Sequence, residues 1–245
     1  MSDLLVTTPA EGVFRLSLED SQNGNHLTEE LCADLMDALA RLAVDPALKV
    51  LVLTGGREVF SAGASLSTLT RGSGGATMIR KLGLPERLVG FPVPVIAALE
   101  GDAIGGGLML AVCCDMLVAA ENRRFGLNFT TLGFSPGMGA TRLVPALVGH
   151  GVAMEMLLSG KFYKGRELVG RGLFNAVVPQ EQVLDVALDQ AMRIAERPRY
   201  VIEMVKAALA EPRLRILADA LEREHALHQL CFARPEIAAT IEDSY

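Results

Sequence analysis

Two glycine-containing segments carry the residues whose spacing could support chemistry. The first, residues 60–65, reads FSAGAS, and the second, residues 100–108, reads EGDAIGGGL. Each follows an apolar run typical of a β-strand, at residues 49–53 and 95–99. Ligands in α/β folds bind beyond the carboxyl ends of strands, so both segments are candidates for a binding site. A helix starting at the three glycines would offer unpaired backbone N–H groups to an anion or an oxyanion.

Phosphate binding is the obvious alternative for these glycines. The chain contains no GxxxxGK[ST] motif, and the stretch GDAIGGG at residues 101–107 does not fit GxGxxG. A second stretch, Gly137-Met138-Gly139, comes near that motif, but Arg142 stands at its last position. The sequence therefore argues against a P-loop or a dinucleotide fold. It leaves two interpretations of the triple glycine: a receptor for developing negative charge, or a place where the backbone packs tightly.

Composition and charge exclude several classes of function. The 245 residues carry a net charge of −6, so the overall field repels nucleic acid and anionic membranes. The uncharged run at residues 103–114 is too short to span a bilayer. Residues 1–4 do not have the pattern that starts a signal peptide. The four cysteines show neither metal-binding spacing nor a disulfide pattern. We therefore predict a cytoplasmic protein that holds no metal and binds neither nucleic acid nor membrane.

Hydrophobic periodicity indicates the elements that would position the two segments. Continuous apolar runs at residues 13–18, 49–53, 94–99 and 116–120 predict strands with both faces covered. Between the first two runs, leucines recur at helical spacing after Thr28, a residue type suited to cap a helix. This alternation of strands and helices predicts an α/β (α+β) fold.

The chain changes character toward its C-terminus. From residue 181 onward only helical patterns remain, and three prolines are expected to break them: Pro198, Pro212 and Pro235. We place an α/β core that holds the active site at residues 1–190 and a helical region at residues 191–245. The helical region is rich in leucine and alanine and needs a partner surface, which a neighbouring subunit would supply.

Four longer stretches have the order and spacing of one known superfamily. They read FSAGASL (residues 60–66), PVPVIAALEGDAIGGGLML (92–110), FGLNFTTLGFSPGMGATRL (125–143) and SGKFYKGRELVGRGLFNAVVP (159–179). Through them the chain resembles the crotonase (enoyl-CoA hydratase/isomerase) superfamily. The resemblance implies a crotonase fold of repeated ββα units, a C-terminal helical trimerisation region, and a homotrimer or dimer of trimers. It also implies an oxyanion hole formed by the backbone N–H groups of Ala64 and Gly106.

The chain departs from the hydratases of this superfamily at both of their catalytic glutamates. Met109 stands where the first glutamate follows the triple glycine, and Phe129 stands where the second follows Phe-Gly. Neither side chain can transfer a proton, so the family's way of adding water is lost. An oxyanion hole beside an apolar wall of Met109 and Phe129 still suits decarboxylation, because electrons released with CO2 can pass through a conjugated C=C into the thioester oxygen. The thioester is the electron sink, so we expect no cofactor.

Two stretches resemble the decarboxylase branch of the polyketide β-branching crotonases. They read FSPGMGAT at residues 134–141 and EHALHQLCFARPE at residues 224–236. This resemblance implies a substrate of the 3-methylglutaconyl-acyl carrier protein type. It also implies that a C-terminal histidine reaches the active site, and the motif assigns that place to His228, with His225 as the weaker candidate.

The same branch uses a lysine and a tyrosine in the flap after the first oxyanion segment, and this chain has neither there. The stretch instead contains Thr68 and the glycine-rich residues 71–75, which form either a surface loop or a mobile flap over the site. The Thr68 hydroxyl could replace one of the missing hydrogen bonds. Arg71 is the nearest substitute for the lysine as a cation that holds a carboxylate.

Three functions remain open from the sequence. The first is a lyase that decarboxylates an α,β-unsaturated dicarboxylic acyl thioester carried by acyl carrier protein or CoA. The second is an enoyl-CoA hydratase or isomerase that uses substitute groups such as Asp102 or His228. The third is a non-catalytic relative that binds an acyl thioester or RNA, and the net charge of −6 argues against RNA.

Overall fold

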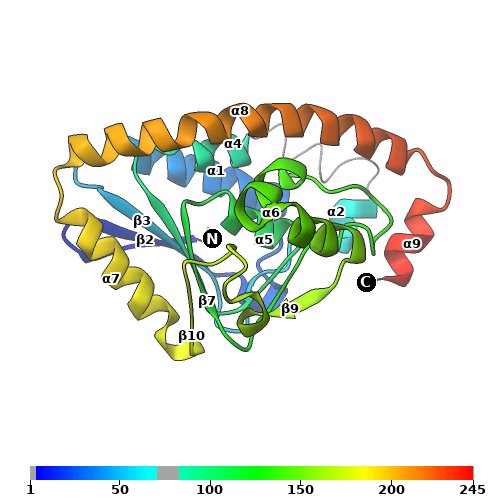
Figure 1. The fold of residues 1–245 in the computed structure, drawn as a ribbon, viewed down its shortest axis with the longest axis horizontal. Coiled ribbons are helices and arrows are strands. Elements are labelled where there is room, and N and C mark those ends of the chain that lie inside the picture. Colours follow the sequence, from blue (N-terminus) through cyan, green and yellow to red (C-terminus); the bar gives the residue numbers. More distant parts are fainter. Residues whose placement is uncertain (1–3, 71–82, 245) are drawn as a thin grey trace.

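The computed structural model describes residues 4–70 and 83–244, which fold around two β-sheets (Figure 1). The larger sheet has six strands in the order β1-β2-β3-β5-β7-β10, and the smaller has four in the order β4-β6-β8-β9. The larger sheet comprises β1 (Leu4–Ala10), β2 (Val13–Leu18), β3 (Val50–Thr54), β5 (Val95–Leu99), β7 (Met116–Ala120) and β10 (Ala176–Val178). The smaller comprises β4 (Val59–Ser61), β6 (Asp102–Ile104), β8 (Arg124–Gly126) and β9 (Phe162–Lys164).

From β3 to β8, successive strands alternate between the two sheets. β3, β5 and β7 lie in the larger sheet, and the strand that follows each of them lies in the smaller sheet. Each pair leads into helical structure: α2 (Leu66–Thr70) after β4, α5 (Gly106–Val112) after β6, and α6 (Ala140–Ser159) after β8. Strands β2, β3, β5, β7 and β10 pair in parallel, as do β4, β6 and β8. The chain therefore consists of the repeated ββα units expected from the sequence.

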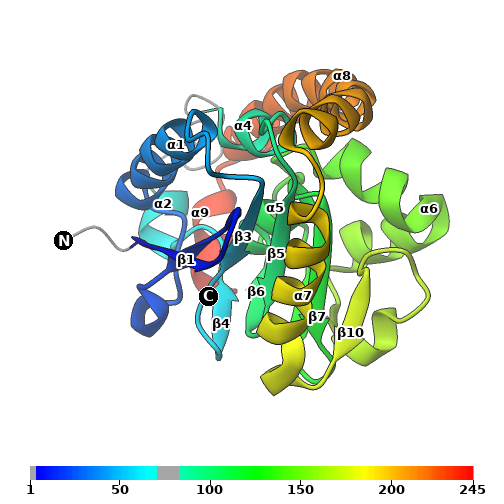
Figure 2. The same cartoon turned by 90° about the vertical axis from the view of Figure 1, so that its left-hand side faces the viewer.

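Helices cover both faces of the larger sheet, which explains why its strands are apolar on both sides. α7 (Val183–Ala195) packs against one face through small residues, Ala187, Ala191 and Ala195 (Figure 2). α1 (Glu29–Ala43), α4 (Leu84–Val89) and α5 belong to the hydrophobic cluster on the other face. Every residue of β3 and β5 is buried. Short 3₁₀ helices lie at Ser21–Asn23, Gly165–Leu168 and Gln180–Gln182.

The predicted strands and the first helix are confirmed. β2, β3, β5 and β7 begin and end within one residue of the predicted runs. The helix predicted after Thr28 is α1, and the Thr28 hydroxyl caps it by accepting a hydrogen bond from the Leu31 N–H at 3.1 Å. The strands of the smaller sheet were not predicted, because each has three residues and so shows no periodicity.

The predicted division at residue 190 falls inside α7. That helix runs unbroken across the position, and Ala191 and Ala195 contact the sheet just as Ala187 does. α7 as a whole therefore packs with the core. The helical region begins after it, with α8 (Arg199–Phe232) and α9 (Ile237–Asp243). Among the helices of the described residues, none is long and apolar enough to cross a membrane.

The break predicted at Pro212 is wrong. α8 continues through Pro212 as one helix of 34 residues, which spans the length of the molecule in Figure 1. A proline removes one intrahelical hydrogen bond. The turns on both sides of it are held to the core by Lys206 and Arg213, which keep the helix in place.

Asp115 is the centre of that anchor. The buried Lys206 ammonium donates to the Val89 carbonyl at 2.9 Å and pairs with the Asp115 carboxylate. Arg213 reaches the same carboxylate at 3.2 Å and donates to the Val112 and Cys114 carbonyls, at the C-terminal end of α5. The other Asp115 oxygen accepts from the Val95 N–H at 2.9 Å. One carboxylate thus joins α8, α5 and β5.

Replacing Lys206 with Met should destabilise the protein by about 2–3 kcal/mol, because the variant leaves the Val89 carbonyl unpaired and part of the Asp115 charge uncompensated. Urea denaturation followed by circular dichroism measures this loss. Arg215→Ala is the matched control, since Arg215 makes an exposed pair with Glu211 on the same helix. Equal denaturation midpoints for the two variants would show that the buried pair does not anchor α8.

Candidate functional site

A pocket of about 210 Å³ opens beside the N-terminus of α5. Its described lining comes from segments far apart in the sequence and includes both segments that the sequence singled out. The lining residues are His26, Ala62, Ala64, Leu69, Ile104, Gly105, Gly106, Asn128, Phe129, Leu132, Phe134 and Ser244. This volume suits a short acyl group, and it is smaller than the roughly 300–1,000 Å³ of pockets that enclose a whole drug-sized ligand.

The loop after β4 is held in place by Asn25 and Ser61. Asn25 is fully buried with a left-handed backbone (φ +46°), and its side-chain amide donates to the Phe60 carbonyl at 3.0 Å. The Ser61 hydroxyl donates to the Asn25 carbonyl at 2.8 Å and accepts from the Gly63 N–H at 3.2 Å. These bonds fix the path of the backbone from β4 to Ala64.

The Gly63–Ala64 peptide has a defined orientation. The Gly63 carbonyl accepts the Leu27 N–H at 2.8 Å, and its oxygen lies 3.1 Å from His26 Nδ1. In a planar trans peptide the N–H points opposite to the C=O. Because the carbonyl points toward Leu27 and His26, the Ala64 N–H is turned to the other side, and Ala64 lines the pocket.

The triple glycine brings the second amide to the same place. Gly105 has φ +53° and ψ −119°, a conformation that side chains rarely allow, and a Cβ on Gly107 would lie 2.1 Å from the Ser61 carbonyl oxygen. A Cβ on Gly63 would lie 2.9 Å from the Gly106 nitrogen, so the two segments touch. Both interpretations of the triple glycine therefore hold, because the backbone packs tightly here and a helix also begins here. The first intrahelical hydrogen bond of α5 runs from the Met109 N–H to the Gly105 carbonyl, so the Gly106 N–H lies outside the hydrogen bonds of the helix.

The two positions predicted as an apolar wall have different surroundings. Phe129 lines the pocket and makes an edge-on contact with Phe134, with ring centroids 6.0 Å apart. Met109 lies on α5, is fully buried in the core and is not among the lining residues of this pocket. The apolar wall is therefore formed by Phe129 with Leu132 and Phe134.

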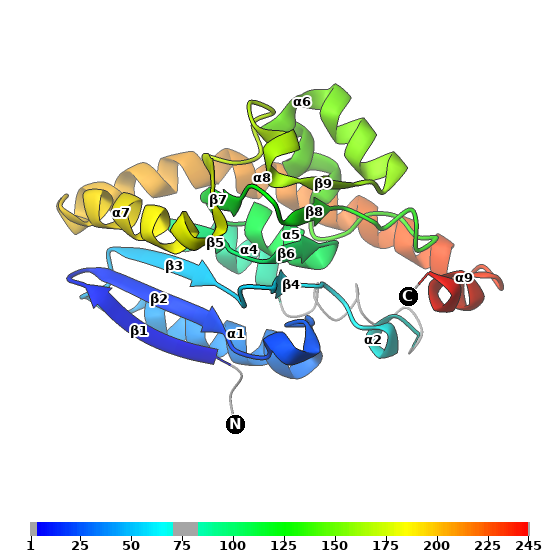
Figure 3. The same ribbon diagram turned by 90° about the horizontal axis from the view of Figure 1, so that it is seen from below.

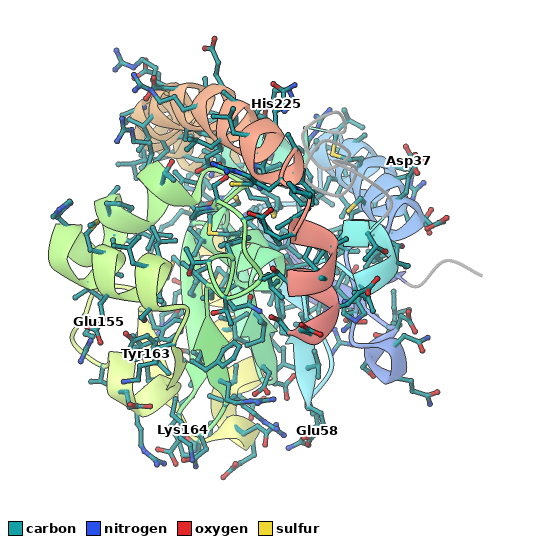
Figure 4. The ribbon with its side chains drawn as sticks, turned by 90° about the vertical axis from the view of Figure 1, so that its right-hand side faces the viewer. Asp37, Glu58, Glu155, Tyr163, Lys164 and His225 are labelled. Atoms are coloured by element: carbon teal, nitrogen blue, oxygen red, sulfur yellow. The ribbon has the colours of Figure 1, made fainter. Side chains whose placement is uncertain are left out.

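His228 is buried one layer behind the pocket wall. Its ring centroid lies 5.8 Å from that of Phe134, which lines the pocket, and His228 does not line it. Its Nδ1 is 2.9 Å from the Glu224 carbonyl oxygen, and since a carbonyl only accepts, Nδ1 carries the hydrogen. Burial lowers the pKa of His228, so the neutral ring is favoured. Figure 4 places His225 on the outer side of α8, away from the pocket.

Glu224 fixes the turn of α8 that carries His228. Its carboxylate accepts from the Gly139 N–H and the Thr141 N–H, both at 2.8 Å, and from the Thr141 hydroxyl at 2.7 Å. These donors belong to the N-terminus of α6, so Glu224 caps that helix from another element. Burial raises the pKa of Glu224, against the effect of its hydrogen bonds. Helix α8 is thereby tied to the loop that follows Phe134.

The C-terminal region reaches the pocket through Ser244. α9 contacts α2, as Figure 3 shows, and Thr240 and Ile237 pack against Gly133. The Ser244 hydroxyl donates to the Thr131 carbonyl at 3.3 Å. The motif predicted this contribution from His228 instead, and the places of His26 and Asn128 in the lining were not predicted. The nearest signal for Asn128 was its place beside Phe129 in the third of the four stretches that carry the family resemblance.

Two of the remaining predicted residues, Thr68 and Asp102, are not among the described lining residues of the pocket. Thr68 lies in α2 with its hydroxyl 2.8 Å from the Ser65 hydroxyl, and its neighbour Leu69 lines the pocket instead. Arg71 and the glycine-rich residues 71–75 lie outside the described residues. Asp102, considered as a substitute acid, accepts two bonds from Arg124, both at 2.8 Å, and is not among the lining residues.

Titratable chemistry is sparse in this pocket. Its described lining contains one histidine, His26, and no carboxylate side chain. Burial raises the pKa of Cys32 and Cys113 to about 12, so neither thiol is a nucleophile at neutral pH. Within the described part of the chain, no group of three His, Cys, Asp or Glu side chains is placed to hold a metal. The pocket offers main-chain donors and apolar surface rather than an acid–base pair.

Known proteins identify the family. The profile of the enoyl-CoA hydratase/isomerase family matches residues 8–243. The chain belongs to this family. It is 32% identical over 233 residues to the bacillaene synthase decarboxylase PksI of Bacillus subtilis, which covers 95% of this chain and 94% of that relative. It is 35% identical over 234 residues to the 2,3-dehydroadipyl-CoA hydratase of Escherichia coli, with 95% and 91% covered.

A solved structure from the same family confirms the fold. It belongs to a dehydratase/decarboxylase enzyme couple involved in polyketide β-branching, and it matches with a TM-score of 0.94 and 31% identity over 100% of this chain and 99% of that one. The crotonase fold and the resemblance to polyketide β-branching enzymes, both inferred from sequence motifs, are therefore confirmed. The family's members named here include both a decarboxylase and a hydratase.

Stability should fall faster on acidification in the wild type than in His228→Gln. The unfolded chain protonates His228 near pH 6.5, whereas the folded state has a lowered pKa. The neutral His228 ring therefore contributes to the free energy of unfolding above the pKa of the unfolded chain. This contribution is lost as the pH falls through the lowered pKa of the folded state. Thermal unfolding at about pH 7.5 and pH 5 measures the difference. Replacing the exposed His150 on α6 with Gln is the control, and a pH dependence in His228→Gln equal to that of the wild type would contradict the lowered pKa.

The two positions of the missing glutamates should respond differently to their return. Met109→Glu places a carboxylate in a fully buried core and should cost about 3–5 kcal/mol of stability, whereas Phe129→Glu faces the pocket and should cost less. Denaturant unfolding of each single variant gives the two values. Similar losses at both positions would contradict the expectation that the pocket admits water to position 129 better than the core admits it to position 109.

Proposed function

We propose that this enzyme decarboxylates an α,β-unsaturated dicarboxylic acyl thioester of the 3-methylglutaconyl type, as a lyase in polyketide β-branching. The thioester is carried by the phosphopantetheine of acyl carrier protein or by CoA, and no metal or redox cofactor takes part. The observation that carries the proposal is the pocket itself: the Ala64 and Gly106 backbones face an apolar wall whose described lining has no carboxylate side chain.

In this reaction the bond between the terminal carboxylate and carbon breaks, and CO2 leaves. The bonding electrons move through the C=C bond into the thioester carbonyl and produce a dienolate with its charge on oxygen. The N–H groups of Ala64 and Gly106 stabilise that oxygen as an oxyanion hole. The apolar wall of Phe129, Leu132 and Phe134 solvates the departing carboxylate poorly, which favours loss of CO2. A water molecule that enters after CO2 has left then donates a proton to carbon, and the hydroxide that remains is neutralised by the solvent.

Two kinds of relative bear on the choice of reaction. Similarity to a decarboxylase and to a hydratase is nearly equal, so overall identity does not separate them. The residues at the two glutamate positions support decarboxylation, because Met109 and Phe129 cannot move a proton to or from water. Asp102, which a hydratase could have used instead, is paired with Arg124 outside the pocket lining.

His228 has a positioning role in this proposal. Direct protonation of the dienolate by its ring would require it to reach past Phe134, against which it packs. The hydrogen bond to the Glu224 carbonyl and the contacts with Phe134 and Phe232 place it where it supports the pocket wall. Substrate contacts by Thr68 and Arg71 stay predictions, as does a cytoplasmic location.

We also propose that the enzyme works as a homotrimer or a dimer of trimers. The outer side of α8 supports an assembly, because large apolar side chains are exposed along its first turns: Tyr200, Met204, Val205 and Leu209. Exposed apolar side chains gathered on one helix are typical of protein–protein contacts.

The Gly106 N–H provides the sharpest test of the reaction. Gly106 is the first residue of α5, a position that accepts proline, so Gly106→Pro deletes the donor and places the proline Cδ where the amide hydrogen was. With 3-methylglutaconyl-acyl carrier protein, mass spectrometry should show loss of CO2 by the wild type, and Gly106→Pro should lower kcat about 100–1,000-fold. Gly106→Ala keeps the N–H and is the matched control. Its Cβ would meet the Leu27 and Met138 side chains at 3.3 and 3.4 Å.

Each other result points to another function. A gain in mass equal to water would indicate a hydratase, and an unchanged mass with retained binding would indicate a non-catalytic relative. Equal rates for Gly106→Pro and Gly106→Ala, with both variants folded by circular dichroism, would remove Gly106 from the oxyanion hole.

A further inference from the structure

His26 is a pocket residue that the proposed reaction does not yet use. It is half-buried, it lines the pocket beside Ala62 and Ala64, and its ring packs close to Gly24, where a Cβ would lie 3.5 Å from Nε2. Its Nδ1 lies 3.1 Å from the Gly63 carbonyl oxygen. That oxygen belongs to the peptide whose N–H is the Ala64 donor.

The hydrogen in this contact can be assigned. A carbonyl oxygen only accepts, so the bond requires the hydrogen on Nδ1 of His26. The same oxygen also accepts the Leu27 N–H at 2.8 Å. Two donors therefore converge on one carbonyl, one from the backbone and one from a side chain in the pocket wall.

We propose that His26 is a positioning residue that strengthens the oxyanion hole through the Gly63–Ala64 peptide. Donation to a carbonyl oxygen polarises its peptide group and makes the N–H on the opposite side a better donor, because hydrogen bonds in a chain reinforce one another. The His26 bond thus acts on the Ala64 N–H without contact between His26 and the reacting atoms. This inference rests on the proposed function only where it predicts a change in the rate of decarboxylation. Its effect on the carbonyl of a bound thioester can be measured whether or not the protein catalyses that reaction.

Other contacts already hold the loop, so the His26 bond is not needed to build it. Leu27 donates to Gly63 from the backbone, Ala62 donates to the Gly24 carbonyl at 2.9 Å, and Ser61 is bonded to Asn25. Removing the His26 donor should therefore leave the fold intact and change the strength of the Ala64 donor. This separates its role from a purely structural one.

The test compares two substitutions of nearly equal size. Asparagine can place its side-chain N–H where Nδ1 lies, so His26→Asn keeps a donor to Gly63. His26→Leu removes it, and His26→Ala serves if the leucine variant does not fold. His150→Leu, at an exposed position on α6, is the control for loss of a histidine.

The first readout is the infrared carbonyl stretch of S-butyrylpantetheine labelled with ¹³C at the carbonyl and bound to each protein. Hydrogen bonds from an oxyanion hole lower this frequency. We expect a smaller lowering in His26→Leu than in the wild type, and recovery of most of it in His26→Asn. The second readout is decarboxylation, for which His26→Leu should lower kcat about tenfold with KM within about twofold, as expected for loss of one neutral hydrogen bond.

The outcomes are distinguishable. An unshifted carbonyl in the wild type, or an equal shift in wild type and His26→Leu, overturns the inference. Equal losses of carbonyl shift and of kcat in His26→Asn and His26→Leu also overturn it. Such a result would mean that the effect comes from other atoms of the imidazole ring and not from the Nδ1 donor. If the carbonyl shift follows the Nδ1-type donor while no CO2 is released, the inference stands and the proposed reaction fails.

Discussion

The orientation of one peptide group, between Gly63 and Ala64, is the constraint on which the site depends. A backbone N–H is held toward a developing oxyanion when the carbonyl of the same peptide group is hydrogen-bonded on the other side. The peptide group then cannot rotate. Here the Gly63 carbonyl is held by Leu27 and His26, and the approach to it is held by Asn25 and Ser61. The triple glycine then allows α5 to come close enough for a second amide, that of Gly106, to face the same space. The catalytic part of the molecule is thus largely backbone, and side chains act mainly by holding it.

This economy explains how one fold can serve several reactions. The amides of Ala64 and Gly106 suit any reaction that places negative charge on a thioester oxygen, and the surrounding side chains decide which reaction follows. In this chain Phe129, Leu132 and Phe134 form an apolar wall, and the polar side chains of the lining are His26, Asn128 and Ser244. A wall of that kind disfavours an activated water and a charged substrate carboxylate alike. The first effect suppresses hydration, and the second promotes loss of CO2.

Much of the core could be predicted because its signal is local. Four strands were found from continuous apolar runs, and α1 from its leucine spacing and the Thr28 cap. The two glycine segments were found because each closely follows an apolar run that predicts a strand. The pocket wall could not be completed in this way, since His26, Asn128 and Ser244 come from three distant segments that only the tertiary fold brings together. The break predicted at Pro212 is wrong for a related reason: the contacts that hold this part of α8 involve Asp115, almost a hundred residues away.

The burial of Met109 has a consequence for the history of such a site. At position 129 a glutamate would face the pocket, where water can solvate its charge. At Met109 the same change meets a sealed interior without water or a counter-charge, and it becomes tolerable only after neighbouring side chains have made room. A glutamate at position 109 alone therefore carries a larger stability cost than a glutamate at position 129. Restoring water addition in such a site is therefore harder at position 109 than at position 129.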